Sequence, residues 1–150
     1  MIKVFKYHKD AVIPSKPNGL DAGYDLVAVE DVFIPVGETE YVNIGLSIEI
    51  PEGWVGLICD RSSMAAKGLN VTGGVIDSGY NGEIKVILNN ISNTHAFQYL
   101  NGESRRGYWV LKNQRVAQIL FIKHENVGFV ETKTLWNSQR GNNGLGSSGL

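Results

Sequence analysis

The sequence predicts an all-β fold, either a sandwich or a barrel, on three observations. Short segments with apolar residues at every second position recur along the chain, turn signals separate them at intervals of about eight to twelve residues, and only one short segment favours a helix. The 150 residues suffice for one domain with a sizeable core. Neither an internal repeat nor an interdomain linker divides the sequence.

The clearest predicted strand spans residues 40–50. Its even-numbered positions from 42 onward are apolar, and the odd-numbered positions from 43 to 49 are polar or glycine, which predicts one buried and one solvated face. The expected buried residues are Val42, Ile44, Leu46, Ile48 and Ile50. A turn at residues 51–53 then leads to a second predicted strand at 54–59.

Further strands are expected in the second half of the chain. Apolar residues recur at every second position from 84 to 88, and residues 116–122 form a near-continuous apolar run, typical of a strand buried on both faces. Residues 127–130 are interpreted as another strand. The single predicted helix is short: Ser62 or Ser63 caps it, residues 64–67 are good helix formers, and Gly68 ends it.

The composition excludes several classes of partner. With 14 basic and 15 acidic side chains the formal net charge is −1, which gives no indication of nucleic-acid or membrane binding. Cys59 is the only cysteine, so an intrachain disulfide is impossible and a reducing compartment fits best. The N-terminus lacks the apolar core of a signal peptide, and no apolar run could span a bilayer. We expect a cytoplasmic protein.

Two segments contribute little to a core. Residues 93–107 are polar, carry Arg105-Arg106, and are interpreted as a long excursion between strands. From residue 137 onward the chain consists mainly of Asn, Ser, Gly and Arg, which predicts a flexible tail unless it docks elsewhere. The expected organisation is therefore a β-barrel domain at 1–136 followed by a flexible C-terminal tail at 137–150.

Residues 74–83 are the most informative stretch of the chain. An apolar run ends at Asp77, Tyr80 follows three residues later, and Asn81-Gly82 is a strong tight-turn dipeptide before the next apolar run. This pattern predicts a hairpin with a carboxylate and an aromatic ring at its tip. Taken alone, an ordinary surface hairpin explains the stretch equally well.

Two other segments have the composition of anion sites. Arg61-Ser62-Ser63 follows a predicted strand and opens the short helix, where an arginine, two hydroxyls and backbone N–H groups can bind an anion. A helix cap beside a surface arginine is the structural alternative. Residues 140–149 are rich in glycine and serine, which can hold phosphate oxygens, although a disordered tail explains this composition at least as well.

Two acids near the N-terminus, Asp21 and Asp25, can orient water around a metal ion, or they can simply be solvated or capping side chains. His8, His95 and His124 are scattered and do not have the spacing of zinc ligands.

Taken in order, five segments resemble the five motifs of the trimeric dUTPase family. They are Ala22-Gly23-Tyr24-Asp25-Leu26, Arg61-Ser62-Ser63, residues 74–83, Arg115-Val116-Ala117-Gln118 and residues 140–149. The resemblance implies a jelly-roll-like β-barrel that forms homotrimers, with each active site assembled from three subunits. It also implies magnesium-dependent hydrolysis of dUTP to dUMP and pyrophosphate, which limits uracil in DNA and supplies dUMP for dTTP synthesis.

The resemblance also implies roles for the third motif. Asp77 resembles the base that activates the water attacking the α-phosphate, a task suited to an ionised carboxylate. Tyr80 resembles the residue whose ring packs under the deoxyribose and excludes a 2′-hydroxyl. The backbone around Gly74 and Ile76 would read the edges of uracil.

The remaining motifs resemble the groups around the triphosphate. Arg61, Ser62, Ser63 and Gln118 resemble its phosphate contacts, and Asp25 resembles the acid that holds Mg²⁺ through water. The tail would close over the site and exclude water. Its residues with expected substrate contacts are Arg140, on the γ-phosphate, and Leu145, Gly146, Ser147 and Ser148.

The chain departs from the family pattern at four places. Leu145 stands where a phenylalanine is common, and a leucine can cover uracil but cannot stack on it. Asp60 stands where proline is common, which is expected to add a negative charge near the phosphate site. Asn113-Gln114 replaces a Gly-Asp turn. The 93–107 excursion is longer than the usual tight hairpin; it is either only a surface loop or a binding site for a protein partner.

Two alternatives stay open from the sequence. The related dCTP deaminases share the barrel but lack the acid and the tyrosine of the third motif, which this chain has at Asp77 and Tyr80. A non-catalytic jelly-roll binding module is the second alternative, and the presence of Asp77, Arg61 and Arg140 argues against it.

Overall fold

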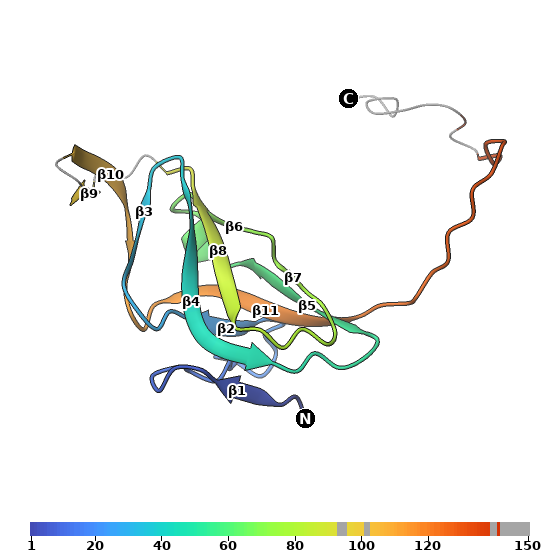
Figure 1. Cartoon of the computed structure of the whole chain (residues 1–150), viewed down its shortest axis with the longest axis horizontal. Coiled ribbons are helices and arrows are strands. Elements are labelled where there is room, and N and C mark those ends of the chain that lie inside the picture. Colours follow the sequence, from blue (N-terminus) through green and yellow to red (C-terminus); the bar gives the residue numbers. More distant parts are fainter. Residues whose placement is uncertain (93–95, 101–102, 139–140, 142–150) are drawn as a thin grey trace.

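The computed structural model describes residues 1–92, 96–100, 103–138 and 141. Within them the chain forms eleven strands and one short helix (Figure 1). In chain order these elements are β1 (Val4–Lys6), β2 (Tyr24–Val27), β3 (Val32–Pro35), β4 (Thr39–Ile48), β5 (Trp54–Asp60), α1 (Ser62–Ala65), β6 (Leu69–Thr72), β7 (Val75–Ile76), β8 (Ile84–Asn90), β9 (Ala96–Leu100), β10 (Glu103–Val110) and β11 (Arg115–Lys123). The predicted all-β, jelly-roll-like fold with one short helix is confirmed.

The strands of the described part of the chain belong to three antiparallel sheets and do not form one closed barrel. Their strand orders are β1-β4-β8-β6, β3-β10-β9 and β2-β11-β5-β7. No helix in these residues is long and apolar enough to cross a membrane.

The alternating pattern of residues 40–50 predicts their burial correctly. All five even-numbered apolar side chains from Val42 to Ile50 are at most 3% exposed, and they pack with β8 residues such as Val86. A register shift interrupts the β4–β8 pairing between Asn43 and Leu46, where Gly45 adopts a left-handed φ of 67°. At this irregularity the chain just after β1 lies against β4. The Tyr7 N–H donates to the Gly45 carbonyl at 2.8 Å.

The prediction of a hairpin at residues 74–83 is wrong. β7 pairs with β5, whereas β8 pairs with β4 and β6, so the turn between β7 and β8 joins two different sheets. The turn is centred on Ser78-Gly79, where the Tyr80 N–H donates to the Asp77 carbonyl, so the Asn81-Gly82 signal lies just after the turn and carries no information on which strands pair.

The predicted strand at residues 127–130 is also absent. The chain leaves the body after β11 and runs outward with its apolar side chains exposed, including Phe129 at 97% (Figure 1). The segment has β propensity, but no strand of the described residues pairs with it. The apolar run at 116–122 is likewise buried on both faces only in its first half, because Ile122 is exposed.

The predicted caps of the helix need correction. The N-cap position of α1 is Arg61, without a capping side-chain hydrogen bond, and Ser62 and Ser63 lie inside the helix. Gly68 does end the segment, with a left-handed φ of 77°, and its N–H donates to the Ala65 carbonyl at 2.8 Å.

Residues 93–107 contain two strands and not simply a loop between strands. β9 and β10 form an antiparallel ribbon whose register pairs Glu103 with Leu100, and β10 continues to pair with β3. Figure 1 shows this ribbon at one end of the molecule, beyond the end of β3. Residues 93–95 and 101–102 of the excursion lie outside the described residues.

Candidate functional site

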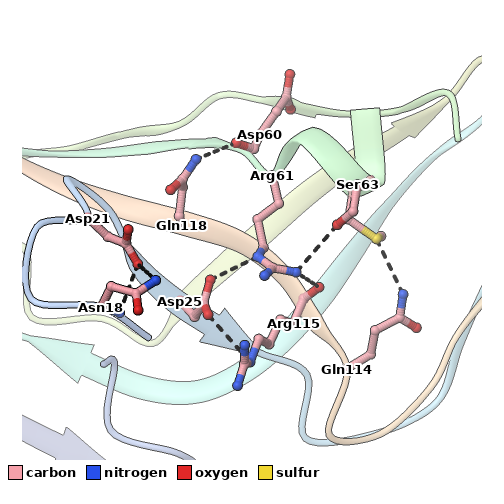
Figure 2. Close-up of polar contacts among 10 residues, drawn as sticks. Asn18, Asp21, Asp25, Asp60, Arg61, Ser63, Gln114, Arg115 and Gln118 are labelled. Atoms are coloured by element: carbon pink, nitrogen blue, oxygen red, sulfur yellow. Dashed lines mark hydrogen bonds and ion pairs between the residues drawn. The ribbon is translucent and has the colours of Figure 1, made fainter. Parts of the chain in front are cut away.

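Residues of the first, second and fourth motifs line one pocket of about 270 Å³. We call it the arginine pocket; it lies between the start of α1 and strands β2 and β11, and Figure 2 shows its polar contacts. Its lining residues are Pro17, Asp21, Ala22, Gly23, Asp25, Arg61, Ser62, Ser63 and Gln118. The structure therefore brings the predicted phosphate contacts Arg61, Ser62, Ser63 and Gln118 together beside the predicted metal-associated acid.

Asp25 is the electrostatic centre of the arginine pocket. The residue is only 8% exposed, and its two carboxylate oxygens pair with different arginines: the Arg61 Nε lies 2.8 Å from Oδ1 and the Arg115 Nε lies 3.4 Å from Oδ2 (Figure 2). The Arg61 guanidinium also donates to the Arg115 carbonyl at 3.4 Å and to the Ser63 hydroxyl at 3.5 Å. One buried acid thus holds two cations, of which Arg61 lines the pocket and Arg115 lies beside it, and the three side chains together carry one net positive charge.

Gln118 is held in the arginine pocket by a hydrogen bond, and it fits there because residue 23 is a glycine and has no side chain. Its Nε2 donates to the Asp60 carbonyl at 2.7 Å. A Cβ on Gly23 would lie 2.1 Å from the Gln118 Oε1, so only glycine at position 23 leaves room for this rotamer. The glycine of the first motif therefore supports the glutamine of the fourth.

The Asp60 carboxylate is turned away from the arginine pocket. It accepts the Val71 N–H at 2.5 Å and the Asn70 amide at 3.3 Å, which ties the end of β5 to β6. Asp60 does not line the arginine pocket, so the negative charge expected there is directed to the β6 backbone instead.

The turn before β11 replaces a glycine with an asparagine. Asn113 adopts a left-handed φ of 67°, a conformation that asparagine tolerates better than most residues. The Gln114 side chain accepts the Leu111 N–H at 3.0 Å and donates to the Tyr108 hydroxyl at 3.0 Å. Asn113-Gln114 thereby provides both the turn geometry and a link between β10 and β11.

The third motif lines a separate pocket of about 350 Å³, which we call the turn pocket. It is lined by Tyr41, Gly73, Val75, Ile76, Asp77, Tyr80, Glu83, Ile84, Lys85 and Ile87. Asp77 is exposed, and Tyr80, 45% exposed, donates its hydroxyl to the Glu83 carbonyl at 3.2 Å. Gly74 packs its backbone against β5, where an added Cβ would lie 2.2 Å from the Ile58 carbonyl oxygen.

The two pockets lie at opposite ends of β5. The register pairs Ile76 with Gly56 in an antiparallel sense, so Asp77 continues past Val55, whereas Arg61 directly follows the other end of the strand. Arg61 lies six positions after Val55 along extended chain. At the usual rise of a strand this is a distance of roughly 20 Å. No residue among those described lines both pockets.

Three residues at or beside these pockets were not among the expected site residues. Arg115 lies beside the arginine pocket and completes the charge cluster on Asp25, and its position at the start of the fourth motif was the available signal. Tyr41 and Lys85 line the turn pocket, with the Lys85 ammonium 5.9 Å from the centre of the Tyr41 ring. Nothing local in the sequence connects them to Asp77, because they come from β4 and β8.

The tail residues expected to contact substrate lie outside the described residues: Arg140, Leu145, Gly146, Ser147 and Ser148. In the part of the chain that the structure describes, no three His, Cys, Asp or Glu side chains gather as metal ligands.

Comparisons with known proteins agree with the five motifs. The family model of the dUTPases matches residues 9–149. The deoxyuridine 5′-triphosphate nucleotidohydrolase of Nocardia farcinica is 41% identical over 140 residues, which cover 91% of this chain and 78% of that protein. The enzyme of the same name from Clostridioides difficile is 36% identical over 153 residues, covering 99% and 98% of the two chains.

A solved structure gives the same result for the fold. The dUTPase of Staphylococcus bacteriophage 80alpha with dUPNHPP superimposes with a TM-score of 0.86 at 27% identity, covering 100% of this chain and 99% of that one. Fold and sequence together define a hydrolase of nucleotide metabolism. The chain belongs to the dUTPase family, and the protein is a dUTP diphosphatase.

Proposed function

We propose that the protein hydrolyses dUTP to dUMP and pyrophosphate with water activated by Asp77, at a site shared between subunits. The observation that carries this proposal is the placement of the two pockets at opposite ends of β5. Groups that act on one phosphate chain must approach it to within hydrogen-bond distance. Since Asp77 and Arg61 of one chain lie roughly 20 Å apart along the strand, they belong to different sites.

The turn pocket is the proposed nucleoside half of the site. The exposed Asp77 carboxylate accepts a proton from the water that attacks the α-phosphate. The Tyr80 ring packs under the deoxyribose, where a 2′-hydroxyl would clash with it. The backbone at Gly74 and Ile76 reads uracil through its own N–H and C=O groups, and Gly74 lets this backbone lie close to β5.

The arginine pocket is the proposed phosphate half. Arg61 is held by Asp25 before substrate arrives, so its guanidinium is pre-oriented for phosphate oxygens, and Ser62, Ser63 and Gln118 supply neutral donors beside it. The C-terminal tail at 137–150 is proposed to close over the nucleotide, with Arg140 on the γ-phosphate. The barrel domain would then end at residue 136.

Asp25 fits the proposed role of holding Mg²⁺ through water. Magnesium in nucleotide sites keeps several waters and needs only one or two carboxylates in addition to substrate phosphates, so a single acid in the pocket is sufficient. The ion would neutralise charge on the phosphate chain during the reaction. Because both Asp25 oxygens already pair with arginines, this carboxylate is better suited to accept hydrogen bonds from bound water than to ligate the metal directly.

A homotrimer is the proposed assembly, and the exposed segment after β11 supports it. Val127, Phe129, Val130, Leu135 and Trp136 are each at least 64% exposed on the single chain. Apolar side chains in such a row gain stability when they dock on another surface. A neighbouring subunit offers that surface, and docking there also carries the tail to a neighbour's site.

The proposed cellular role is to limit uracil in DNA and to supply dUMP for dTTP synthesis. A cytoplasmic location is part of this proposal, in agreement with a single cysteine and no possible intrachain disulfide.

The direct test is release of pyrophosphate from each dNTP and NTP, with and without magnesium. We expect turnover of dUTP alone at a substantial rate, and only with magnesium. Release of ammonia from dCTP would instead indicate a deaminase, and no turnover of any nucleotide would indicate a binding module.

Sharing of the site is tested by mixing two inactive proteins. Asp77→Asn and a chain truncated after Trp136 are each expected to be nearly inactive. Unfolded and refolded together, they should regain a fraction of wild-type activity, because some trimers combine an intact Asp77 with an intact tail. Each protein refolded alone is the control. Mixed trimers that stay as inactive as the controls would show that the tail acts on its own subunit or that the site is not shared.

A further inference from the structure

The backbone carbonyl of Asn81, the residue after Tyr80, accepts hydrogen bonds from two hydroxyl groups elsewhere in the fold. The Asn81 carbonyl accepts a hydrogen bond from the Tyr7 hydroxyl at 3.2 Å and another from the Ser47 hydroxyl at 3.3 Å. Tyr7 lies just after β1 and Ser47 lies on β4, so two segments far apart in sequence meet at this carbonyl. We call this pair of hydrogen bonds the Asn81 clasp.

The two donors are themselves firmly placed. The Tyr7 N–H donates to the Gly45 carbonyl at 2.8 Å, and its ring meets the Phe5 ring edge-on, with centroids 5.0 Å apart and an interplanar angle of 79°. Phe5 lies directly opposite Ser47 in the β1–β4 register. Cross-strand neighbours project to the same face of a sheet, so the Ser47 side chain lies on the face of Phe5, whose ring contacts that of Tyr7.

The turn that they hold has little rigidity of its own. Gly79 has a left-handed φ of 84°, and no atom outside its chain neighbours would lie within 4 Å of a Cβ there. Inside the turn, the Tyr80 N–H donates to the Asp77 carbonyl at 3.2 Å. The Ser78 hydroxyl donates to the Ile50 carbonyl at 3.3 Å and anchors the turn on the side before Gly79. The Asn81 clasp is the corresponding anchor on the side after it.

The clasp acts on the Tyr80 ring through the adjacent backbone. The ring leans over Gly82, where a Cβ would come within 2.5 Å of the Tyr80 hydroxyl oxygen, and that hydroxyl donates to the Glu83 carbonyl. The position of the Tyr80 backbone and the position of its hydroxyl therefore both depend on the backbone of residues 81–83. A shift of the Asn81 carbonyl would move the ring relative to Asp77.

We propose that Tyr7 and Ser47 are positioning residues for sugar discrimination: their hydroxyls fix the Asn81 carbonyl and thereby hold the Tyr80 ring where a 2′-hydroxyl would clash. This inference rests on the proposed role of Tyr80. It extends the site to residues that belong to none of the five motifs and that need not touch the substrate.

The test is the ratio of kcat/KM for dUTP to kcat/KM for UTP in variants that remove only hydroxyls. Tyr7→Phe keeps the ring contact with Phe5, and Ser47→Ala keeps the strand. Each single variant should lower the ratio about two- to fourfold, and the double variant about tenfold, in line with the usual contribution of a hydrogen bond between neutral groups. Ser47→Thr, which retains the hydroxyl, should restore the ratio in place of Ser47→Ala.

A matched control loosens the same pair of strands without touching the clasp. Lys3→Met removes the exposed ion pair between Lys3 and Glu49, which joins the start of β1 to the end of β4 at 3.1 Å. Its ratio should equal that of the wild type. A loss in Lys3→Met as large as in the double variant would overturn the proposal, because general loosening of β1 would then explain both.

Two further measurements separate failure of the clasp from failure of the Tyr80 role. If Tyr80→Ala lowers the ratio and the double variant does not, the clasp is overturned. If Tyr80→Ala leaves the ratio unchanged, the role of Tyr80 fails, and amide exchange at Tyr80 decides the clasp. Faster exchange of this N–H in the double variant than in Lys3→Met would support the clasp, and equal exchange would overturn it.

Discussion

Replacing Gly23 by alanine tests whether the arginine pocket depends on a missing side chain. The added Cβ would lie 2.1 Å from the Gln118 Oε1, 2.7 Å from its Cδ and 3.0 Å from its Cβ. Most of this overlap is with the far end of a flexible side chain, so Gln118 should rotate away while the backbone stays in place. The variant is therefore expected to fold, with the Gln118 side chain displaced from the arginine pocket.

The magnitude follows from the contact that Gln118 loses. Its 2.7 Å hydrogen bond to the half-buried Asp60 carbonyl is broken, and an unsatisfied group of this kind costs about 1–3 kcal/mol. The smaller conformational entropy of alanine in the unfolded chain offsets about 0.4–1 kcal/mol of this. We expect a net loss of about 1–2 kcal/mol in the free energy of unfolding. Loss of the proposed phosphate contact should lower kcat/KM for dUTP roughly tenfold.

The assay is a double-mutant cycle measured by urea unfolding and by pyrophosphate release. Gly23→Ala should lose most of its destabilising effect in a Gln118→Ala background, because the two nearest atoms that it overlaps, Oε1 and Cδ of Gln118, are then gone. Gly19→Ala is the matched control, since no atom lies within 4 Å of its Cβ, and it should be neutral or slightly stabilising. Equal destabilisation by Gly23→Ala with and without the Gln118 side chain would refute the reasoning.

Three other changes address different parts of the molecule. Asp77→Asn should still bind a non-hydrolysable dUTP analogue but lose about two to four powers of ten in turnover; near-normal turnover in a folded protein would remove Asp77 from the mechanism. Asp60→Ala should cost about 1–3 kcal/mol in urea unfolding, because the Val71 N–H loses its acceptor, and an unchanged midpoint would contradict that role. Leu145→Phe should tighten tail closure by about 1 kcal/mol through stacking on uracil, measured as KM and as protease protection with the analogue; weaker protection would count against a lid role for position 145.

Local sequence patterns predicted the strands of this fold better than they predicted which strands pair with one another. The alternation from Val42 to Ile50 identifies a strand and its buried face, because burial of one face imposes a period of two on the sequence. The pairing of β7 with β5 has no comparable local signal. Asn81-Gly82 predicts a turn, but the turn lies at Ser78-Gly79, and the strands on its two sides enter different sheets.

A turn signal was also overlooked within residues 93–107. Asn101-Gly102 separates β9 from β10, and Asn-Gly is the strongest short-range indication of a hairpin. The segment was interpreted as polar throughout, although four of the five residues of β9, Ala96, Phe97, Tyr99 and Leu100, are apolar or aromatic. The segment at 127–130 shows the opposite case: its composition is typical of a strand, but it pairs with no strand in the part of the chain that the structure describes.

The candidate site was predictable to the extent that its motifs are contiguous. The gathering of Asp25, Arg61 and Gln118 in one pocket agrees with the family motifs. The pairing of Asp25 with Arg115, the orientation of the Asp60 carboxylate and the clasp on Asn81 depend on distances between strands. Such distances are set by the packing of the whole domain, so no short window of sequence contains them.

The position of one half-site at each end of β5 has a genetic consequence. Under the proposed sharing, a subunit with a defective turn pocket inactivates one site of a ring, and a subunit with a defective arginine pocket inactivates a different one. A single polypeptide with both defects therefore disables two sites, although it occupies only one place in the ring. When such an allele is expressed beside a normal copy, activity should fall more steeply with its dosage than for either single defect, and the double mutant should be the more dominant inhibitor.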